Sequence, residues 1–236
     1  MADPTGRSAP TVLIIGASRG LGFGLAREYL ARGWQVIGTV RGKAETVLHG
    51  LLPEAKGRLE IEHLEMTDNS QIEALHQRLA GRKLDLLWVN AGIAYGAKET
   101  INTVSDDQFV AIMVTNALAP MRVVEKFQDL VAPNGMIALM SSGLGSVTNN
   151  TRGTWEVYRA SKAALNTLMR SFDFRHKGES RSLVLVAPGW VKTDMGGPEA
   201  EIDLDTSMKG VVNMLERQAG KPGLVYMNYK GETLPW

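Results

Sequence analysis

Short apolar runs alternate with longer amphipathic segments along most of the chain. The first run, TVLII at residues 11–15, is rich in β-branched residues and ends at a glycine, which is typical of a strand buried on both faces of a sheet. Similar runs recur along the chain, so the pattern predicts seven strands. They are expected at residues 11–15, 34–40, 58–66, 84–89, 136–140, 182–187 and 224–228.

The segments between these runs have the spacing of helices that bury one face. Helices are expected at residues 21–32, 68–80, 105–131, 154–176 and 206–218. Asp68 can cap the second helix, Ser105 begins the third, and the turn Pro133-Asn-Gly135 precedes the fifth strand. Strands that alternate with helices form a parallel sheet with right-handed crossovers. The expected fold class is therefore α/β, a single-domain Rossmann-type doubly wound sheet of about seven parallel strands flanked by helices.

Length and composition favour one soluble domain. The 236 residues suit a single large α/β domain, and neither a linker nor an internal repeat divides them. Residues 1–10 are polar and rich in Pro and Gly, so we expect a flexible leader followed by a folded domain over residues 11–236. No apolar run approaches the roughly 18–20 residues that cross a bilayer. We expect a cytoplasmic protein that does not associate with a membrane.

Charge and metal-binding residue types narrow the function classes. The net charge is +1 and the basic residues are scattered, so we expect no nucleic-acid partner. The chain has no cysteine, which excludes disulfides and thiolate metal sites. Its four histidines lack the spacing of metal ligands, so we predict no metal.

A glycine cluster follows the first predicted strand and opens the first predicted helix. It reads Gly16-Ala-Ser-Arg-Gly20-Leu-Gly22, a G-x-x-x-G-x-G spacing. Glycines at such a turn let main-chain N–H groups approach a pyrophosphate at the helix N-terminus. A plain strand-to-helix turn is the alternative, but the position after the first buried strand favours dinucleotide binding.

The end of the second predicted strand indicates which dinucleotide binds. An NAD-preferring site places an acidic residue there to bind the ribose hydroxyls. This chain has Gly38-Thr-Val-Arg41, without a carboxylate. Arg41 and Arg19 could both pair with a 2′-phosphate, although both could also be ordinary surface cations. The missing acid is the stronger half of the argument, and we predict NADP(H) over NAD(H).

Tyr158 and Lys162 lie four residues apart on a predicted helix and therefore share a face. A nearby positive charge lowers the pKa of a phenol, which would let Tyr158 exchange a proton with a carbonyl or alcohol oxygen near neutral pH. Alone the pair is weak evidence, since many amphipathic helices carry it by chance.

Further motifs follow the glycine cluster along the chain. In order, the set is Gly16–Gly22, Asn90-Ala91-Gly92, Asn116, Ser141-Ser142-Gly-Leu-Gly145, Tyr158-x-x-x-Lys162 and Pro188-Gly189. Together and in this order they resemble the short-chain dehydrogenase/reductase family, and the fold-level likeness extends from about residue 11 to residue 236. The tyrosine motif, the Pro-Gly segment and the last residues look like the C-factor/sniffer-type carbonyl reductase branch.

The resemblance implies a catalytic role for four residues. Tyr158 would be the general acid, Lys162 would lower its pKa and hold the nicotinamide ribose, and Ser142 would donate a hydrogen bond to the substrate oxygen. Asn116 would anchor a water that resupplies protons through Lys162. Ser142 is preferred because its spacing to Gly145 matches the family pattern; Ser141 is the structural alternative.

The resemblance also implies the residues that surround the cofactor. They are Gly16, Ser18, Arg19, Gly20, Leu21, Gly22, Arg41, Glu65, Asn90, Ala91, Gly92, Tyr158, Lys162, Pro188, Gly189, Val191 and Thr193. Glu65 stands where the family often has an Asp that contacts the adenine, and its extra methylene leaves that contact open. Residues 196–205 follow the Pro-Gly motif, where the family carries its substrate lid, although they could form a passive loop.

Three functions fit these features to different degrees. An NADP(H)-dependent oxidoreductase that reduces aldehydes or ketones, or oxidises the matching alcohols, uses every motif. A nucleotide sensor or C-factor-like signalling protein would need no proton donor. A 3-oxoacyl-carrier-protein reductase would need a basic docking face, which the scattered cations do not suggest. The family likeness suggests a homodimer or homotetramer built on helices 105–131 and 154–176.

Overall fold

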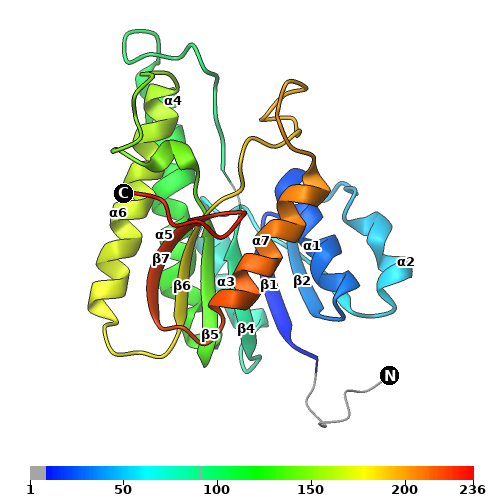
Figure 1. The fold of residues 1–236 in the computed structure, drawn as a ribbon. Helices are drawn as coiled ribbons and strands as arrows, with labels where there is room; N and C mark the ends of the chain where they lie inside the picture. The colour runs from blue at the N-terminus through cyan, green and yellow to red at the C-terminus, as the bar shows by residue number, and fades with distance from the viewer. Residues whose placement is uncertain (1–8, 91) are drawn as a thin grey trace.

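The computed structural model describes residues 9–90 and 92–236, so Ala91 and most of the predicted leader lie outside the described residues. Over these residues the centre is a parallel seven-stranded sheet with the order β3-β2-β1-β4-β5-β6-β7 (Figure 1). This confirms the predicted fold class. The strands are β1 (Thr11–Ile15), β2 (Gln35–Val40), β3 (Leu59–His63), β4 (Leu84–Val89), β5 (Val131–Met140), β6 (Ser182–Ala187) and β7 (Gly223–Asn228).

Helices cover both faces of the sheet. The helices are α1 (Gly20–Ala31), α2 (Leu52–Ala55), α3 (Asn69–Arg78), α4 (Asp106–Met113), α5 (Ala119–Phe127), α6 (Glu156–Arg175) and α7 (Leu204–Gln218). Successive strand residues point to opposite faces, so Leu13 and Ile15 join one apolar cluster while Val12 and Ile14 join the other. Buried residues of α3, α5 and α6 belong to the first cluster, and those of α1, α2 and α7 to the second (Figure 1).

Several helix ends follow from local chemistry. Asp68 accepts hydrogen bonds from the backbone of Ser70 and Gln71, which confirms its predicted capping role at α3. Ser105 and Gln108 form a reciprocal capping box at α4. The sequence pattern did not predict α2 or the 3₁₀ turn η1 (His49–Leu51) ahead of it, because both are too short to show a helical period.

The helix predicted over residues 105–131 is confirmed as a continuous helical path from Asp106 to Leu130, but it is not a regular α-helix throughout. After α4 the chain makes a π-turn, η2 (Val114–Leu118), before α5 begins, and it ends in the 3₁₀ turn η3 (Gln128–Leu130). Pro120 is one cause, since it has no N–H with which to continue the regular hydrogen-bond ladder. Val131 already belongs to β5, and Pro133-Asn-Gly135 lies within that strand at a register irregularity against β4.

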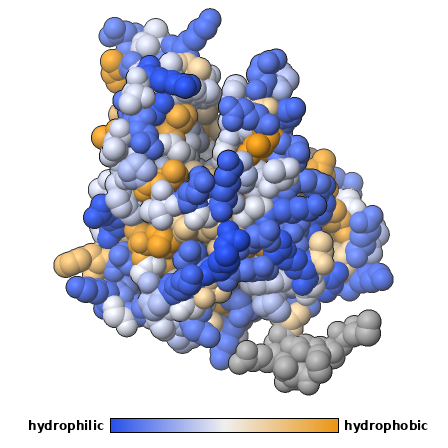
Figure 2. Space-filling view, viewed as in Figure 1, coloured by the Kyte–Doolittle hydropathy of each residue, from blue (hydrophilic) through white to orange (hydrophobic). Residues whose placement is uncertain are grey.

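The order in which the chain adds strands reverses at β1. The strands β2 and β3 follow on one side of it, and the chain then crosses to the other side, where β4 pairs with β1. Crevices at the carboxyl ends of strands beside such a switch are the usual ligand sites of α/β folds. The segments after β4 and β6 rise above that edge as two projections, and Figure 2 shows the surface hollowed between them. The predicted motif residues lie on the loops and helix ends at this edge.

Candidate active site

The glycine loop joins β1 to α1 and is pinned to the end of β2. Gly16 donates its main-chain N–H to the Thr39 hydroxyl at 2.9 Å, and Ala17 donates to the Thr39 carbonyl at 2.8 Å. Gly16 and Gly20 have positive φ angles of 88° and 56°, which favour glycine. Thr39 was not recognised from the sequence, because a threonine in a strand has no distinctive signal.

The third glycine allows a close approach that no other residue could make. A Cβ atom at Gly22 would lie 2.0 Å from the Gly16 carbonyl oxygen and 2.8 Å from Nδ2 of Asn90. The start of α1 can therefore pack directly under the loop, which exposes the helix N-terminus to an anion. Ser18 and Leu21 lie in the same segment and are partly buried.

The loop after β4 meets the glycine loop across the switch point. Asn90 donates from Nδ2 to the Gly16 carbonyl at 3.0 Å. Its Oδ1 atom is buried and has no hydrogen-bond partner among the described residues. An orphaned acceptor beside a glycine cradle fits a ligand that brings hydroxyl groups, such as a nucleoside ribose. Ala91 was also predicted to line this end, but lies outside the described residues.

The two arginines predicted for a 2′-phosphate each have an acidic neighbour. Arg19, at the N-terminus of α1, pairs with Asp194 at 3.1 Å, and Arg41, directly after β2, pairs with Glu65 at 3.6 Å. Both arginine side chains are about 70% exposed, so these ion pairs contribute little to stability and can exchange partners. No carboxylate belongs to the last residues of β2, but Glu65 reaches the same corner from the segment after β3.

Tyr158 and Lys162 lie on the first turns of α6, with the Lys162 Nζ atom 5.8 Å from the centre of the Tyr158 ring. Lys162 is almost fully buried and donates to the Met140 carbonyl at 2.9 Å. Burial lowers the pKa of Lys162 to about 8. The ammonium group is therefore mostly charged at pH 7 and titrates only slightly above it.

The expected lowering of the tyrosine pKa is not found. Burial raises the pKa of Tyr158 to about 12, and hydrogen bonding with the Ser142 hydroxyl offsets only part of this increase. The prediction considered the Lys162 charge and left out the cost of placing a phenolate inside the protein. A tyrosine with a high pKa is fully protonated at neutral pH, so it is a donor in its resting state.

The two adjacent serines have different environments. Ser141 is buried and donates to the Asn166 Oδ1 atom at 2.7 Å, so its hydroxyl proton is already engaged. Ser142 is partly exposed, accepts a bond from the Leu144 N–H at 3.1 Å, and lies in hydrogen-bonding reach of Tyr158. This geometry favours Ser142 as the residue that faces a substrate.

Gly145, three residues after Ser142, allows the loop after β5 to pack against α6, the helix that carries Tyr158. A Cβ atom at Gly145 would lie 3.0 Å from the Cβ atom of Lys162 and 3.2 Å from its carbonyl carbon. The predicted Ser-x-x-Gly spacing thus has a packing reason, since the 3₁₀ turn η4 (Gly143–Gly145) must touch the backbone of α6.

Asn116 lies in the π-turn and is completely buried. Its side chain donates to the Ile93 carbonyl and to the Ser161 hydroxyl and accepts from the Ile93 N–H, at 2.8 to 3.0 Å. The amide therefore ties the loop after β4 to α6. Its own carbonyl lacks the donor that a regular α-helix supplies four residues on, because that residue is Pro120.

The segment after β6 closes the other side of the site. Pro188 accepts from Ser207 at the start of α7, and Gly189 has a φ of 85°. Val191 is buried and bridges to Ile202. Thr193 accepts from the Gly196 N–H at 3.1 Å, and its Cγ2 atom would lie 3.9 Å from a Cβ atom placed at Gly20. The predicted nicotinamide end therefore lies across from the glycine loop.

Trp155 has a backbone conformation that is rare for a bulky residue. Its φ of 61° and ψ of 37° lie in the left-handed region at the N-terminus of α6. Its N–H donates to the Ala97 carbonyl at 3.3 Å, and its ring contacts Tyr158 edge-on with 5.9 Å between centroids. The loop after β4 and the N-terminus of α6 are thereby joined beside Tyr158.

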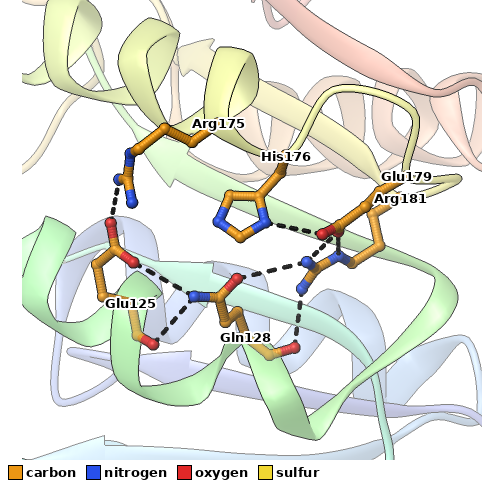
Figure 3. Close-up of polar contacts among 6 residues, drawn as sticks. All are labelled: Glu125, Gln128, Arg175, His176, Glu179 and Arg181. Carbon is orange, nitrogen blue, oxygen red and sulfur yellow. Dashed lines mark hydrogen bonds and ion pairs between the residues drawn. The ribbon is translucent and has the colours of Figure 1, made fainter.

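A second hollow, of about 510 Å³, lies at the end of α6 and does not contain the motif residues. Three of its lining residues belong to a polar network (Figure 3), in which Arg181 bonds to Gln128 and Glu179 and His176 bonds to Glu179. Beside them Arg175 pairs with Glu125. This arrangement is typical of a structural network. Among the described residues, no group of three or more His, Cys, Asp or Glu could hold a metal ion.

The fold and this site define the class of the protein. The family model described as short chain dehydrogenase matches residues 10–203. The chain therefore belongs to the short-chain dehydrogenase family. No helix within the described part of the chain is long and apolar enough to span a membrane.

Two solved structures of high similarity contain NADP. A short-chain dehydrogenase/reductase from Burkholderia multivorans with bound NADP is 50% identical, with a TM-score of 0.95, and the match covers 97% of this chain and 100% of the other. A carbonyl reductase from Pseudomonas aeruginosa PAO1 in complex with NADP is 36% identical, with a TM-score of 0.90 and the same coverage.

The narrower branch is also confirmed. The C-signal protein of Myxococcus xanthus is 32% identical over 155 residues, which cover 65% of this chain and 93% of that protein. The carbonyl reductase Sniffer of D. melanogaster is 28% identical, with a TM-score of 0.84, over 97% of this chain and 100% of the other. Both represent the branch that the sequence motifs indicated.

Proposed function

We propose that the protein is an NADP(H)-dependent short-chain oxidoreductase that reduces aldehyde or ketone carbonyls, or oxidises the matching alcohols. The observation that carries the proposal is the convergence of Ser142, Tyr158 and Lys162 at the crevice that the glycine loop borders. The NADP-bound relatives from Burkholderia and Pseudomonas support the choice of cofactor.

The residues present fit this cofactor. The glycine cradle and the unpartnered Asn90 oxygen suit the pyrophosphate and the adenosine ribose, and Arg19 and Arg41 are exposed enough to turn to a 2′-phosphate. When bound, NADPH supplies the hydride for the carbonyl carbon.

The protein's own groups act on the substrate oxygen. Ser142 donates a hydrogen bond to the oxygen and stabilises the negative charge that develops there. Tyr158 donates its proton to the same oxygen, which becomes a much stronger base than the carbonyl as the reaction proceeds. The raised pKa of about 12 for Tyr158 suits this direction, because the donor is protonated before each turnover.

A route for returning the proton to Tyr158 follows from the neighbouring groups. Lys162 has a pKa of about 8 and lies beside the tyrosine, so it can exchange protons near neutral pH. Pro120 cannot donate to the Asn116 carbonyl, which would instead accept from a water that connects the lysine to solvent. Asn116 thus contributes its main chain to this route, while its side chain positions Ile93 and Ser161.

A sensor or signalling role is the alternative, and similarity to the C-signal protein favours keeping it. A protein that only binds a nucleotide needs neither a proton donor nor a serine aimed at a substrate oxygen. The combination of Ser142, Tyr158 and Lys162 therefore favours the enzyme.

The test is loss of NADPH absorbance with a panel of aldehydes, ketones, diketones and quinones. Tyr158→Phe should lower kcat at least about a hundredfold, in line with removal of a general acid, and leave the Kd for NADPH within about threefold. Tyr29→Phe, which removes the hydroxyl of another buried tyrosine on α1, is the matched control and should leave kcat unchanged. Full activity of Tyr158→Phe, or no turnover by the wild type with any carbonyl, would refute the proposal.

A further inference from the structure

The last residues of the described chain fold back along β7 and reach the loop that carries Ser142. The segment turns at Gly231, and Leu234 donates its N–H to the Tyr226 carbonyl at 2.8 Å. Figure 1 shows this segment, in red, turning after β7 and running back beside it to the C-terminus next to α6. The turn brings Trp236 next to the start of the loop between β5 and α6.

Trp236 contacts three elements. Its ring stacks on Tyr226 of β7, with 5.5 Å between centroids, and lies 4.8 Å beneath the Arg170 guanidinium of α6. Its main-chain oxygen accepts from the Thr148 N–H at 3.0 Å and from the Ser146 hydroxyl at 3.3 Å. These contacts hold one side of the loop between Ser142 and α6.

Tyr226 reaches the catalytic serine itself. It is buried, with 1% of its surface exposed, and its hydroxyl donates to the main-chain carbonyl of Ser142. Its hydroxyl also lies near the Ser141 and Asn166 side chains, which bond to each other. The backbone of Ser142 is therefore fixed from below by a group on β7, whereas its side chain faces Tyr158.

The loop has little else to hold it beyond η4. Residues 147–154 are all exposed, and they read Val-Thr-Asn-Asn-Thr-Arg-Gly-Thr. Ser146 is completely buried, but its hydroxyl bonds are to Asn149 and to Trp236. An exposed polar segment with few contacts has a low local stability unless another element ties it down.

We propose that Tyr226 and Trp236 are positioning residues that hold Ser142 and the loop after it in the orientation that catalysis needs. The inference rests on the proposed function, since it assigns a task to residues that support the same site. Neither residue contacts Tyr158 or Lys162 through a hydrogen bond, so both act through the Ser142 segment. A displacement of about 1 Å at such a site can lower the rate about a hundredfold.

Kinetics of a double-mutant cycle test the catalytic part. Tyr226→Phe removes only the hydroxyl and keeps the stacked ring; it should lower kcat about tenfold or more, with the Kd for NADPH within about threefold. In a Ser142→Ala background, Tyr226→Phe should lower kcat less than about twofold, because the serine hydroxyl that Tyr226 positions is no longer present. Tyr29→Phe, which removes the hydroxyl of a buried tyrosine in the apolar cluster on the other face of the sheet, is the control and should keep kcat within about threefold.

Hydrogen exchange tests the structural part without any need for turnover. In Trp236→Ala, amides of residues 142–149 should exchange at least about tenfold faster than in the wild type, while those of β1 and β4 keep their protection. If the wild type reduces no carbonyl but the loop loses protection, the proposed function fails and the positioning role stands. The inference is overturned if the amides of residues 142–149 exchange at the same rate in Trp236→Ala as in the wild type. It is also overturned if Tyr226→Phe lowers kcat as much in the Ser142→Ala background as in the wild type.

Discussion

Replacing the buried lysine by methionine should make the nucleotide-free protein more stable and inactive. Lys162 has 2% of its surface exposed, and burial lowers its pKa from 10.5 to about 8. A shift of this size corresponds to about 3 kcal/mol of cost for keeping the ammonium charged inside the protein. Lys162→Met removes that cost and also removes the bond to the Met140 carbonyl, which is worth about 1 kcal/mol. The net gain in the free energy of unfolding at pH 7 should be about 2 kcal/mol.

The pH dependence of this gain separates charge burial from simple packing. Between about pH 8 and 10.5 the unfolded wild type binds more protons at Lys162 than the folded wild type does. The wild type therefore becomes more stable as pH rises through this window, whereas the methionine variant has no such group. From pH 7 to pH 9.5 the advantage of Lys162→Met should shrink by about 2 kcal/mol.

Urea unfolding of nucleotide-free protein, followed by circular dichroism at several pH values, measures these differences. Lys177→Met is the control, because Lys177 is exposed, and its effect on the free energy of unfolding should be small at every pH. The reasoning is refuted if Lys162→Met destabilises the protein at pH 7, or if its effect stays constant from pH 7 to pH 9.5.

Two further predictions concern the cofactor end of the site. Gly22→Ala should weaken NADPH binding at least about tenfold in calorimetry, because the new Cβ would lie 2.0 Å from the Gly16 oxygen and the glycine loop must move. Gly50 has open space around it, so the control variant Gly50→Ala should bind NADPH like the wild type. Equal affinities for all three proteins would contradict the assignment of the glycine loop to NADPH. Glu65→Gln should tighten NADPH binding about two- to fivefold at low salt and leave NADH binding unchanged, because the carboxylate 3.6 Å from Arg41 competes with a 2′-phosphate for that cation. An equal change for NADPH and NADH would show that Arg41 does not read the phosphate.

Sequence patterns predicted the sheet well because its strands carry unambiguous local signals. Thr11–Ile15 is a continuous apolar run, and the structure buries four of its five residues completely. The glycine loop was equally readable, since Gly16 and Gly22 are needed for a backbone conformation and a close approach that other residues cannot provide.

The features that were missed depend on contacts between distant parts of the chain. Tyr226 looks like an ordinary strand residue in the sequence, and only the fold brings its hydroxyl to a carbonyl 84 positions away. The raised pKa of Tyr158 arises from burial, which no spacing of charges along a helix can reveal. The π-turn at Asn116 was hidden for a similar reason, since its bonds to Ile93 and Ser161 become visible only when three elements meet.

The π-turn also constrains how this part of the chain can vary in length. It adds one residue to a helical path, and each residue turns an α-helix by about 100°. The turn holds its extra residue as a bulge and leaves the face of α5 unchanged, whereas α5 itself has no such bulge. Removing a single residue from α5 would rotate the residues beyond the deletion, so that Val123, Val124 and Phe127 would swing away from the sheet. The segment 147–154 could absorb a deletion, because all of its residues are exposed. The same deletion within α5 would displace side chains that form one wall of the core. We therefore expect homologous chains to vary freely in the length of that segment and to keep the residue count of this helix fixed.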